Sequence, residues 1–339
     1  MAVSIGVFDH MDSGDFPPHE LYEHRLNLIA VYDAAGFHGY HLAEHHQTSL
    51  GMAPSPGLFL AAAIARTKQI RLGTLIYIVP AYSPLRLIEE ICMLDHLSRG
   101  RFQFGMGRGI SPFETAFHGI RSEDSHAMYR EAVEIVLKGL TQESLSHSGK
   151  YWNYADVPMV LRPFQSPHPP LWVGPPNADG AAAAAERKLN IVINNPRAAA
   201  RTITDAYIRA YRQAHGDGPM PKMGLVRHIY VGETDADALR IATPAYRRWK
   251  LSHVELWRRM GTDNHLWPEQ LDEAIAKDGA IIGSPETVIR EVNDALAVSG
   301  CNYLVGRFAF GNMTYSDTRR SVDLFIREVM PKIGARNQE

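Results

Sequence analysis

The chain has very little cysteine, no long apolar run and almost no net charge. Its 339 residues include only Cys92 and Cys301, too few for a disulfide framework or a cysteine-rich metal site. No stretch approaches the roughly 20 apolar residues of a transmembrane helix, and Met1–His10 lacks the basic flank and apolar run of a signal peptide. A formal net charge of -2 argues against nucleic acid or a membrane surface as a partner. We therefore expect a cytoplasmic α/β protein.

What the sequence does contain is an alternation of short apolar runs with longer amphipathic segments. The expected strands are Val3–Phe8, Gly39–Leu42, Ile70–Val79, Phe102–Gly105, Leu171–Val173, Ile191–Ile193, Met223–Val231 and Asn302–Val305. The expected helices are Leu21–Ala35, Gly57–Arg66, Leu85–Leu97, Ser125–Leu140, Ala178–Arg187, Pro196–His215, Pro285–Val298 and Asp317–Ile333. Segments 141–170 and 235–280 interrupt the alternation, and we interpret them as excursions from it.

Eight strand–helix repeats without a linker favour a closed (β/α)8 barrel, formed by residues 1–339 as a single domain. An open, doubly wound parallel sheet would produce the same alternation and remains the alternative. In a barrel, the loops that follow the carboxyl ends of the strands build the active site. This rule selects Glu44–His46, Tyr82, Met106–Arg108, Gly174–Asp179 and Asn194–Asn195.

The segment Leu42-Ala43-Glu44-His45-His46 places a carboxylate and two imidazoles where the second strand ends. Histidine titrates near neutral pH, so these groups suit acid–base chemistry, although histidines packed for structural reasons would look the same. Zinc is a poor match, because zinc-binding helices carry the sequence His-Glu-x-x-His. Here His41 and His45 have the spacing, but Glu44 precedes the second histidine and His41 lies in a predicted strand. We expect no metal site.

Two glycine-rich loops could hold an anion. Phe104-Gly105-Met106-Gly107-Arg108-Gly109 suits a phosphate or a flat cofactor lying against the backbone, but a tight turn with an exposed arginine fits equally well. Gly174-Pro175-Pro176-Asn177-Ala178-Asp179 leads into a helix whose first N–H groups could bind an anion. Simple capping of that helix by Asn177 or Asp179 is the alternative. No Gly-x-Ser-x-Gly elbow provides a serine nucleophile.

Taken together, the motifs resemble those of the bacterial luciferase-like, flavin-dependent monooxygenases. The ordered matches are Gly36-Phe37, Ala43-Glu44-His45-His46, Arg71-Leu72-Gly73-Thr74, Val79-Pro80, Pro84-Leu85-Arg86, Leu94-Asp95, Ser98-Arg99-Gly100-Arg101-Phe102, Gly105 with Arg108-Gly109, Ala184-Ala185-Glu186-Arg187, Ile282-Gly283-Ser284-Pro285-Glu286 and Val329-Met330-Pro331. The resemblance implies a (β/α)8 barrel that binds FMN at the carboxyl ends of the strands, usually as a homodimer. It also implies a separate NAD(P)H:flavin reductase that supplies reduced FMN. Reaction with O2 then forms a C4a-peroxyflavin, which oxygenates an organic substrate.

The resemblance also implies roles for individual residues. His45 matches the catalytic histidine, with His46 and Glu44 in support. Thr74, Leu75 and Ile76 match the backbone beneath the isoalloxazine, where the family often has a non-proline cis peptide. Met106, Gly107 and Arg108, together with Gly174, Pro175, Pro176 and Asn177, match the loops around the cofactor and its phosphate. The chain departs from luciferase at His126, where luciferase has a second phosphate-binding arginine, at Gly107, where it has a reactive cysteine, and at Gly180, where it has a hydroxyl residue.

Other functions remain open at this stage. A related barrel could use the deazaflavin F420 for hydride transfer, although the near-neutral charge offers no basic trough for that cofactor's polyglutamate tail. A non-catalytic flavin-binding protein is a third reading. We expect a small, fairly apolar substrate whose pocket could include Met52, Tyr82, Phe113 and Trp249, each of which could equally be ordinary packing. The resemblance places the dimer contact at the Leu85–Leu97 helix.

Overall fold

The strands form a closed parallel barrel. The computed structural model describes residues 3–334. The barrel strands are β1 (Ser4–Asp9), β2 (Gly39–Leu42), β3 (Arg71–Thr74), β5 (Phe102–Gly107), β8 (Leu171–Val173), β9 (Asn190–Ile193), β10 (Met223–Val231) and β12 (Tyr303–Arg307). Each strand pairs in parallel with the next in this order, and β12 pairs with β1 to close the ring. The expected (β/α)8 barrel is confirmed, and the open sheet is excluded.

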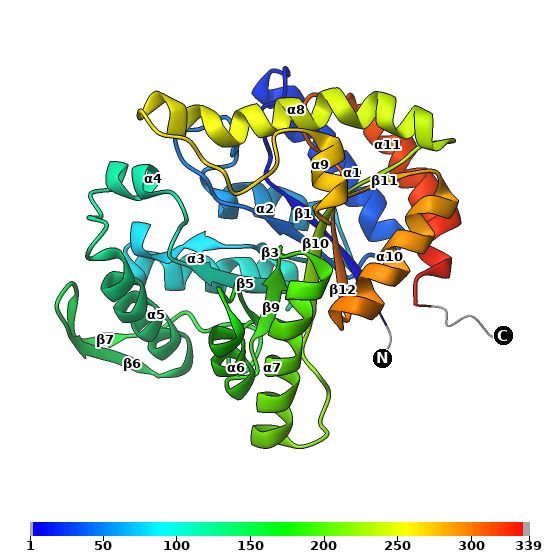
Figure 1. Ribbon diagram of the computed structural model, residues 1–339. Coiled ribbons are helices and arrows are strands. Elements are labelled where there is room, and N and C mark those ends of the chain that lie inside the picture. Colours follow the sequence, from blue (N-terminus) through cyan, green and yellow to red (C-terminus); the bar gives the residue numbers. More distant parts are fainter. Residues whose placement is uncertain (1–2, 335–339) are drawn as a thin grey trace.

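Helices surround the barrel and connect its strands (Figure 1). They are α1 (Pro18–Ala34), α2 (Pro56–Ala65), α3 (Pro84–Ser98), α5 (Ser125–Thr141), α6 (Ala178–Glu186), α7 (Arg197–His215), α10 (Pro285–Ser299) and α11 (Tyr315–Leu324). Shorter or additional elements are β4 (Tyr77–Ile78), η1 (Val79–Ala81), α4 (Pro112–Phe117), β6 (Ser144–Ser148), β7 (Asn153–Pro158), α8 (Asp235–Arg259), α9 (Leu271–Ala276), β11 (Ala280–Gly283), η2 (Phe325–Val329) and η3 (Met330–Lys332). Within residues 3–334, no helix combines the length and the apolar character needed to cross a bilayer.

The barrel interior is filled by side chains. Because side chains alternate along a strand, every second residue points inward, and these residues pack into one buried cluster: Phe8, Ala43, Leu75, Trp172, Val226, Tyr303 and Val305. Residues of this cluster also make two polar contacts. The hydroxyl of Tyr303 lies 2.9 Å from Nε2 of His41, and the indole N–H of Trp172 donates to Gln103. The packed interior leaves the carboxyl-end mouth as the place for a site.

The predicted strand Ile70–Val79 is wrong in its extent. The structure divides it into β3 and β4, and the peptide bond between Leu75 and Ile76, which lies between them, is cis. The resemblance implies such a bond here. Strand β5 approaches very closely at this point, because a Cβ on Gly105 would lie 2.0 Å from the carbonyl oxygen of Thr74. β-Branched residues lie on both sides of the break, at Thr74 and at Ile76, Ile78 and Val79, so the pattern could not reveal it.

The two interruptions contain structure that the sequence did not predict in detail. In segment 141–170, β6 and β7 form an antiparallel hairpin. In segment 235–280, α8 and α9 are followed by β11, which pairs with the second half of β10. The expected helix Asp317–Ile333 is wrong as one helix: it comprises α11, the π-helical turn η2 and the 3-10 turn η3. Pro331 in that last turn lacks the N–H that a continuing α-helix needs.

Candidate active site

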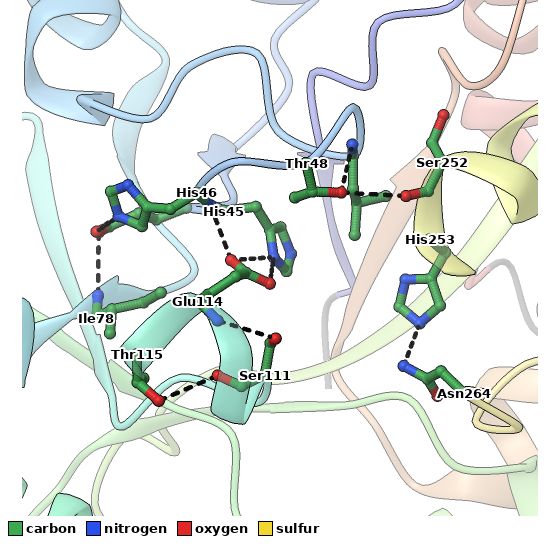
Figure 2. Close-up of polar contacts among 12 residues, drawn as sticks. His45, His46, Thr48, Ile78, Ser111, Glu114, Thr115, Ser252, His253 and Asn264 are labelled. Carbon is green, nitrogen blue, oxygen red and sulfur yellow. Dashed lines mark hydrogen bonds and ion pairs between the residues drawn. The ribbon is translucent and has the colours of Figure 1, made fainter. Parts of the chain in front are cut away.

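His45 leaves the end of β2 and faces a carboxylate from another part of the chain. Its Nδ1 lies 3.2 Å from Oε2 and 3.3 Å from Oε1 of Glu114, a buried residue of α4. The same carboxylate accepts a hydrogen bond from the backbone N–H of His46 at 2.8 Å (Figure 2). Ser111 caps α4 by accepting a hydrogen bond from the N–H of Glu114. The cap and the backbone contact together hold Glu114 against the His45 ring.

His46 and Glu44 form a second pair beside the first. Nε2 of His46 lies 2.7 Å from Oε1 of Glu44, and the other Glu44 oxygen accepts a hydrogen bond from the N–H of Ile78 at 3.0 Å. Burial raises the pKa of Glu44, and the hydrogen bonds from His46 and Ile78 oppose that rise. Glu44 therefore contacts the imidazole of His46, while Glu114, which sequence reasoning missed, contacts that of His45.

A small pocket separates the His45–Glu114 pair from a second histidine, His253 of α8. Figure 2 shows His45 and Glu114 on one side of this opening, with His253 and Asn264 on the other. The remaining lining residues are Thr48, Leu50, Ile110, Leu256 and Trp257. Burial lowers the pKa of His253 to about 3, so this ring is neutral at physiological pH. The pocket thus has one wall with an acid–base pair and one wall that is polar but uncharged.

Helix α8 forms the cover of the barrel mouth (Figure 1). The carbonyl of Ser252 accepts a hydrogen bond from the Thr48 hydroxyl at 3.3 Å, and Glu255 accepts one from the N–H of Ser49 at 2.9 Å. Arg248 donates to the carbonyl of Gly14 at 2.7 Å. These contacts attach α8 to the loops that follow β1 and β2, next to His45.

The four residues suggested for a substrate pocket do not gather in one place. Trp249 is fully buried in a cluster between α8 and β10. Phe113 of α4 meets Trp257 edge to face, with ring centroids 5.3 Å apart. Met52 and Tyr82 pack against the main hydrophobic core. Most of these side chains are in ordinary packing environments.

The loops after β5 and β8 lie side by side, because these two strands pair. Arg108 is half-buried, and its Nη1 lies 3.3 Å from the hydroxyl of Ser125 at the start of α5. His126 follows on α5 and is exposed. Gly174 and Pro176 are exposed, and Pro175 is half-buried.

Asn177 caps α6, since its side-chain oxygen accepts a hydrogen bond from the N–H of Gly180 at 2.9 Å. Asn177 therefore caps the helix, which was the alternative interpretation of this loop. At Gly174 a Cβ would meet nothing closer than 3.9 Å, so the backbone edge is open on that side. Arg108 has five N–H donors and makes one side-chain hydrogen bond within the described residues. An arginine with free donors beside an open glycine edge fits the phosphate of a nucleotide-like cofactor.

The other residues matched to the cofactor contribute mainly through their backbone. The hydroxyl of Thr74 donates to the carbonyl of Gly105 at 3.0 Å, and Met106 is buried in the main core. Leu75 packs inside the barrel. Gly107 lies close to Ile76, since a Cβ there would come within 2.6 Å of Cγ1 of that residue. These side chains pack within the protein, so a flat ring placed here would contact backbone.

The histidines that suggested a zinc spacing are separated in the structure. His41 contacts Tyr303 inside the barrel, whereas His45 contacts Glu114 at the mouth. Among residues 3–334, no group of three or more histidine, cysteine, aspartate or glutamate side chains is placed to hold a metal ion.

Comparison with known proteins adds three observations. The family model described as "Luciferase-like monooxygenase" matches residues 3–302. The uncharacterized protein y4wF of Sinorhizobium fredii is 36% identical over 340 residues, which cover 98% of each chain. The oxygenase component of flavin-dependent trigonelline monooxygenase from Acinetobacter baylyi is 24% identical, over 96% of this chain and 94% of the relative.

A solved structure supports the same architecture. The oxygenating constituent of 3,6-diketocamphane monooxygenase of Pseudomonas putida, in complex with FMN, has a TM-score of 0.82 to this chain. The two are 23% identical, and the match covers 98% of this chain and 99% of the other. At a sequence identity of 23%, the structural similarity establishes the fold.

Proposed function

The chain belongs to the luciferase-like monooxygenase family, and on that premise we propose that it is a flavin-dependent monooxygenase. It uses reduced FMN and O2 to oxygenate a small organic substrate. The observation that carries the proposal is the His45–Glu114 pair, which lines a pocket at the barrel mouth. The flavin-dependent trigonelline monooxygenase component among the relatives supports the choice of chemistry.

The proposed role of His45 is to hold and move a proton next to the reacting atoms. A positioned histidine suits this task because it exchanges protons near neutral pH. Glu114 is a positioning residue: its carboxylate fixes the ring through Nδ1. Glu44 and His46 support the loop on the side away from Glu114, since Glu44 accepts a hydrogen bond from the N–H of Ile78 at the end of β4.

The cofactor is held by the loops after β3, β5 and β8 in this proposal. Arg108, with His126 and the open edge at Gly174, binds the phosphate, and the backbone of the Leu75–Ile76 segment and Gly107 contacts the ring. Reduced FMN, when bound, supplies the electrons that activate O2. Helix α8 covers the mouth and limits the access of water to the reacting groups.

We test this with FMN reduced by a separate NAD(P)H:flavin reductase, O2, and a panel of ketones, aldehydes and amines. The expected result is substrate-dependent product formation, with kcat reduced about 10²- to 10⁴-fold in His45→Ala. His19→Ala, which replaces an exposed histidine, serves as the matched control. Binding of F420 but not FMN would replace the proposal with hydride transfer. Binding of FMN with wild-type behaviour in His45→Ala would contradict the mechanism, and FMN binding without any turnover would indicate a non-catalytic flavin-binding protein.

We further propose that the chain acts as a homodimer in the cytoplasm. An apolar groove of about 810 Å³ lies along α2, α3 and the end of β7. Leu58, Met93 and Val160 are exposed there by 78%, 56% and 87%, an unusual density of exposed apolar side chains. Light scattering at micromolar concentration should show a dimer that Met93→Glu dissociates. A monomeric wild-type chain would contradict this.

A further inference from the structure

Arg307 is a cation buried at the inner face of the barrel mouth. It ends β12, and Tyr303 and Val305 on the same face of the strand belong to the interior cluster. Arg307 is 2% exposed. One terminal nitrogen, Nη2, donates to the side-chain oxygen of Asn194 at 3.0 Å. Within residues 3–334, Nε and Nη1 have no hydrogen-bond partner.

Aromatic rings surround the Arg307 guanidinium. Its carbon lies 5.0 Å from the ring centre of Phe8, 4.9 Å from that of Trp267 and 5.9 Å from that of Trp249. Such rings attract a cation through their faces but accept no strong hydrogen bond. Burial lowers the pKa of Arg307 to about 9, so the side chain remains charged at neutral pH.

Two other buried arginines, Arg25 and Arg227, have protein partners that Arg307 lacks. Arg25 donates to the carboxylate of Asp9 at 2.9 Å. Arg227 gives both terminal nitrogens to the backbone carbonyls of Val226 and Asn195, and only its Nε has no partner within the described residues. No carboxylate among the described residues forms an ion pair with Arg307. A buried cation without a counter-charge is unfavourable, which points to an anion that binds from outside the chain.

A second buried group with unused hydrogen-bonding capacity lies next to Arg307. His228 of β10 is its register partner across the strand pair, is fully buried, and has no partner at either ring nitrogen within the described residues. Burial, reinforced by the charge of Arg307, lowers its pKa well below the usual value, so the ring is neutral. Asn194, which accepts the hydrogen bond from Arg307, is exposed, so this corner of the mouth reaches solvent.

We propose that Arg307 binds the carboxylate of the substrate, which is therefore an organic acid with a flat, apolar body. The half-buried Trp267 contacts that body. This specificity rests on the proposed monooxygenase function. A series of ring contacts connects this corner to the acid–base pair: His10 lies 5.7 Å from Trp249 and 5.8 Å from His45, between ring centroids. The acid group is thus anchored on the β12 side, and the rest of the molecule extends toward His45.

The test compares benzoate with its neutral isostere benzamide, each titrated into the flavin-free chain and followed by tryptophan fluorescence. We expect benzoate to bind at least tenfold more tightly than benzamide to the wild-type chain. Arg307→Met should weaken benzoate binding at least tenfold and leave benzamide unchanged, and Arg307→Lys should retain part of the preference. Arg240→Met, which removes an exposed charge on α8, should bind both as the wild type does.

Three outcomes would overturn the proposal. Equal affinity of the wild-type chain for benzoate and benzamide would do so without any variant, so the test does not depend on the folding of Arg307→Met. Loss of benzoate binding in Arg240→Met as well would indicate a general charge effect. Weaker FMN binding in Arg307→Met, with benzoate binding intact, would place the guanidinium against the flavin instead.

The same measurements separate this inference from the proposed function. Benzoate binding is measured without flavin, O2 or turnover. If the preference for the acid is absent but turnover still depends on His45, only the inference about the acid fails. If the preference is present but no oxygenation occurs with any acid tested, the proposed function fails.

Discussion

Replacing Asp12 by asparagine should stabilise the fold at neutral and alkaline pH. Asp12 follows β1 and is 1% exposed. One carboxyl oxygen accepts a hydrogen bond from the N–H of Gly311 at 2.7 Å, and the other has no partner among the described residues. Burial raises the pKa of Asp12 to about 7, with the charge of Asp9 adding to the rise and that of Arg25 opposing it. The folded chain therefore keeps this group protonated at pH values where the unfolded chain ionises it.

The sign and size of the effect follow from this difference. Between the unfolded pKa of 3.8 and the folded value of about 7, the folded state binds more protons, so the free energy of unfolding falls as the pH rises. One pKa unit corresponds to about 1.4 kcal/mol, so the full shift amounts to about 4 kcal/mol. Asparagine keeps the acceptor for Gly311 and does not ionise. Asp12→Asn should match the wild type near pH 4 and exceed its stability by up to about 4 kcal/mol above pH 8.

Urea unfolding followed by circular dichroism and tryptophan fluorescence from pH 4 to 8 measures this difference. The control is Asp15→Asn, which removes a carboxylate on the same loop whose side chain is 63% exposed, and which should not change the slope with pH. A stability difference between Asp12→Asn and the wild type that is constant across the pH range would refute the reasoning. So would a gain of equal size in Asp15→Asn.

Three further predictions concern the barrel mouth. Glu114→Gln removes the charge that holds His45, and kcat should fall roughly 10- to 100-fold, the loss of a hydrogen bond to a charged group of about 1.5–3 kcal/mol. Gly105→Ala would place a Cβ 2.0 Å from the Thr74 carbonyl oxygen, and the free energy of unfolding should fall by about 3 kcal/mol or more, as measured in urea. Asn177→Ala removes the cap of α6 and should lower that free energy by about 1 kcal/mol.

Each of these has its own control. Wild-type kcat in Glu114→Gln would mean that the carboxylate has no part in turnover. Gly174→Ala, where a Cβ has no neighbour within 3.9 Å, should leave stability unchanged, and an equal loss at both glycines would contradict the close-approach argument. Asn177→Asp keeps a capping oxygen and should restore the stability lost in Asn177→Ala.

The barrel was predictable because its strands are short, apolar and separated by regular amphipathic helices. The eight predicted barrel strands are all present, with ends shifted by a few residues. What the pattern could not show depends on contacts between strands: the break at Leu75–Ile76 lies where Gly105 of β5 comes very close to the Thr74 backbone. The strand β11 is an exception, because Ala280-Ile281-Ile282-Gly283 is a visible apolar run that begins at the end of the interruption at 235–280 and that the pattern did not predict as a strand.

The candidate site was predictable only where a local motif marked it. His45 and His46 stand out at a strand end, but Glu114 lies 69 residues beyond His45. One signal was present: Ser111 followed three residues later by Glu114 has the form of a capping box and predicts a helix start. Nothing local distinguishes Arg307, because its proposed role rests on the lack of hydrogen-bond partners for Nε and Nη1 among residues 3–334.

The position of helix α8 in the sequence bears on how proteins of this family can change their substrate. His253 and Trp257, which line the pocket opposite His45, lie in a single stretch inserted between β10 and β11, whereas His45 and Glu114 lie within the first 114 residues of the chain. Substitutions within this one contiguous segment can therefore change the substrate without altering the His45–Glu114 pair. Chimeras that exchange residues 235–279 between relatives should transfer ligand preference and retain chemistry, provided that the attachments of α8 to the Thr48–Ser49 loop are kept.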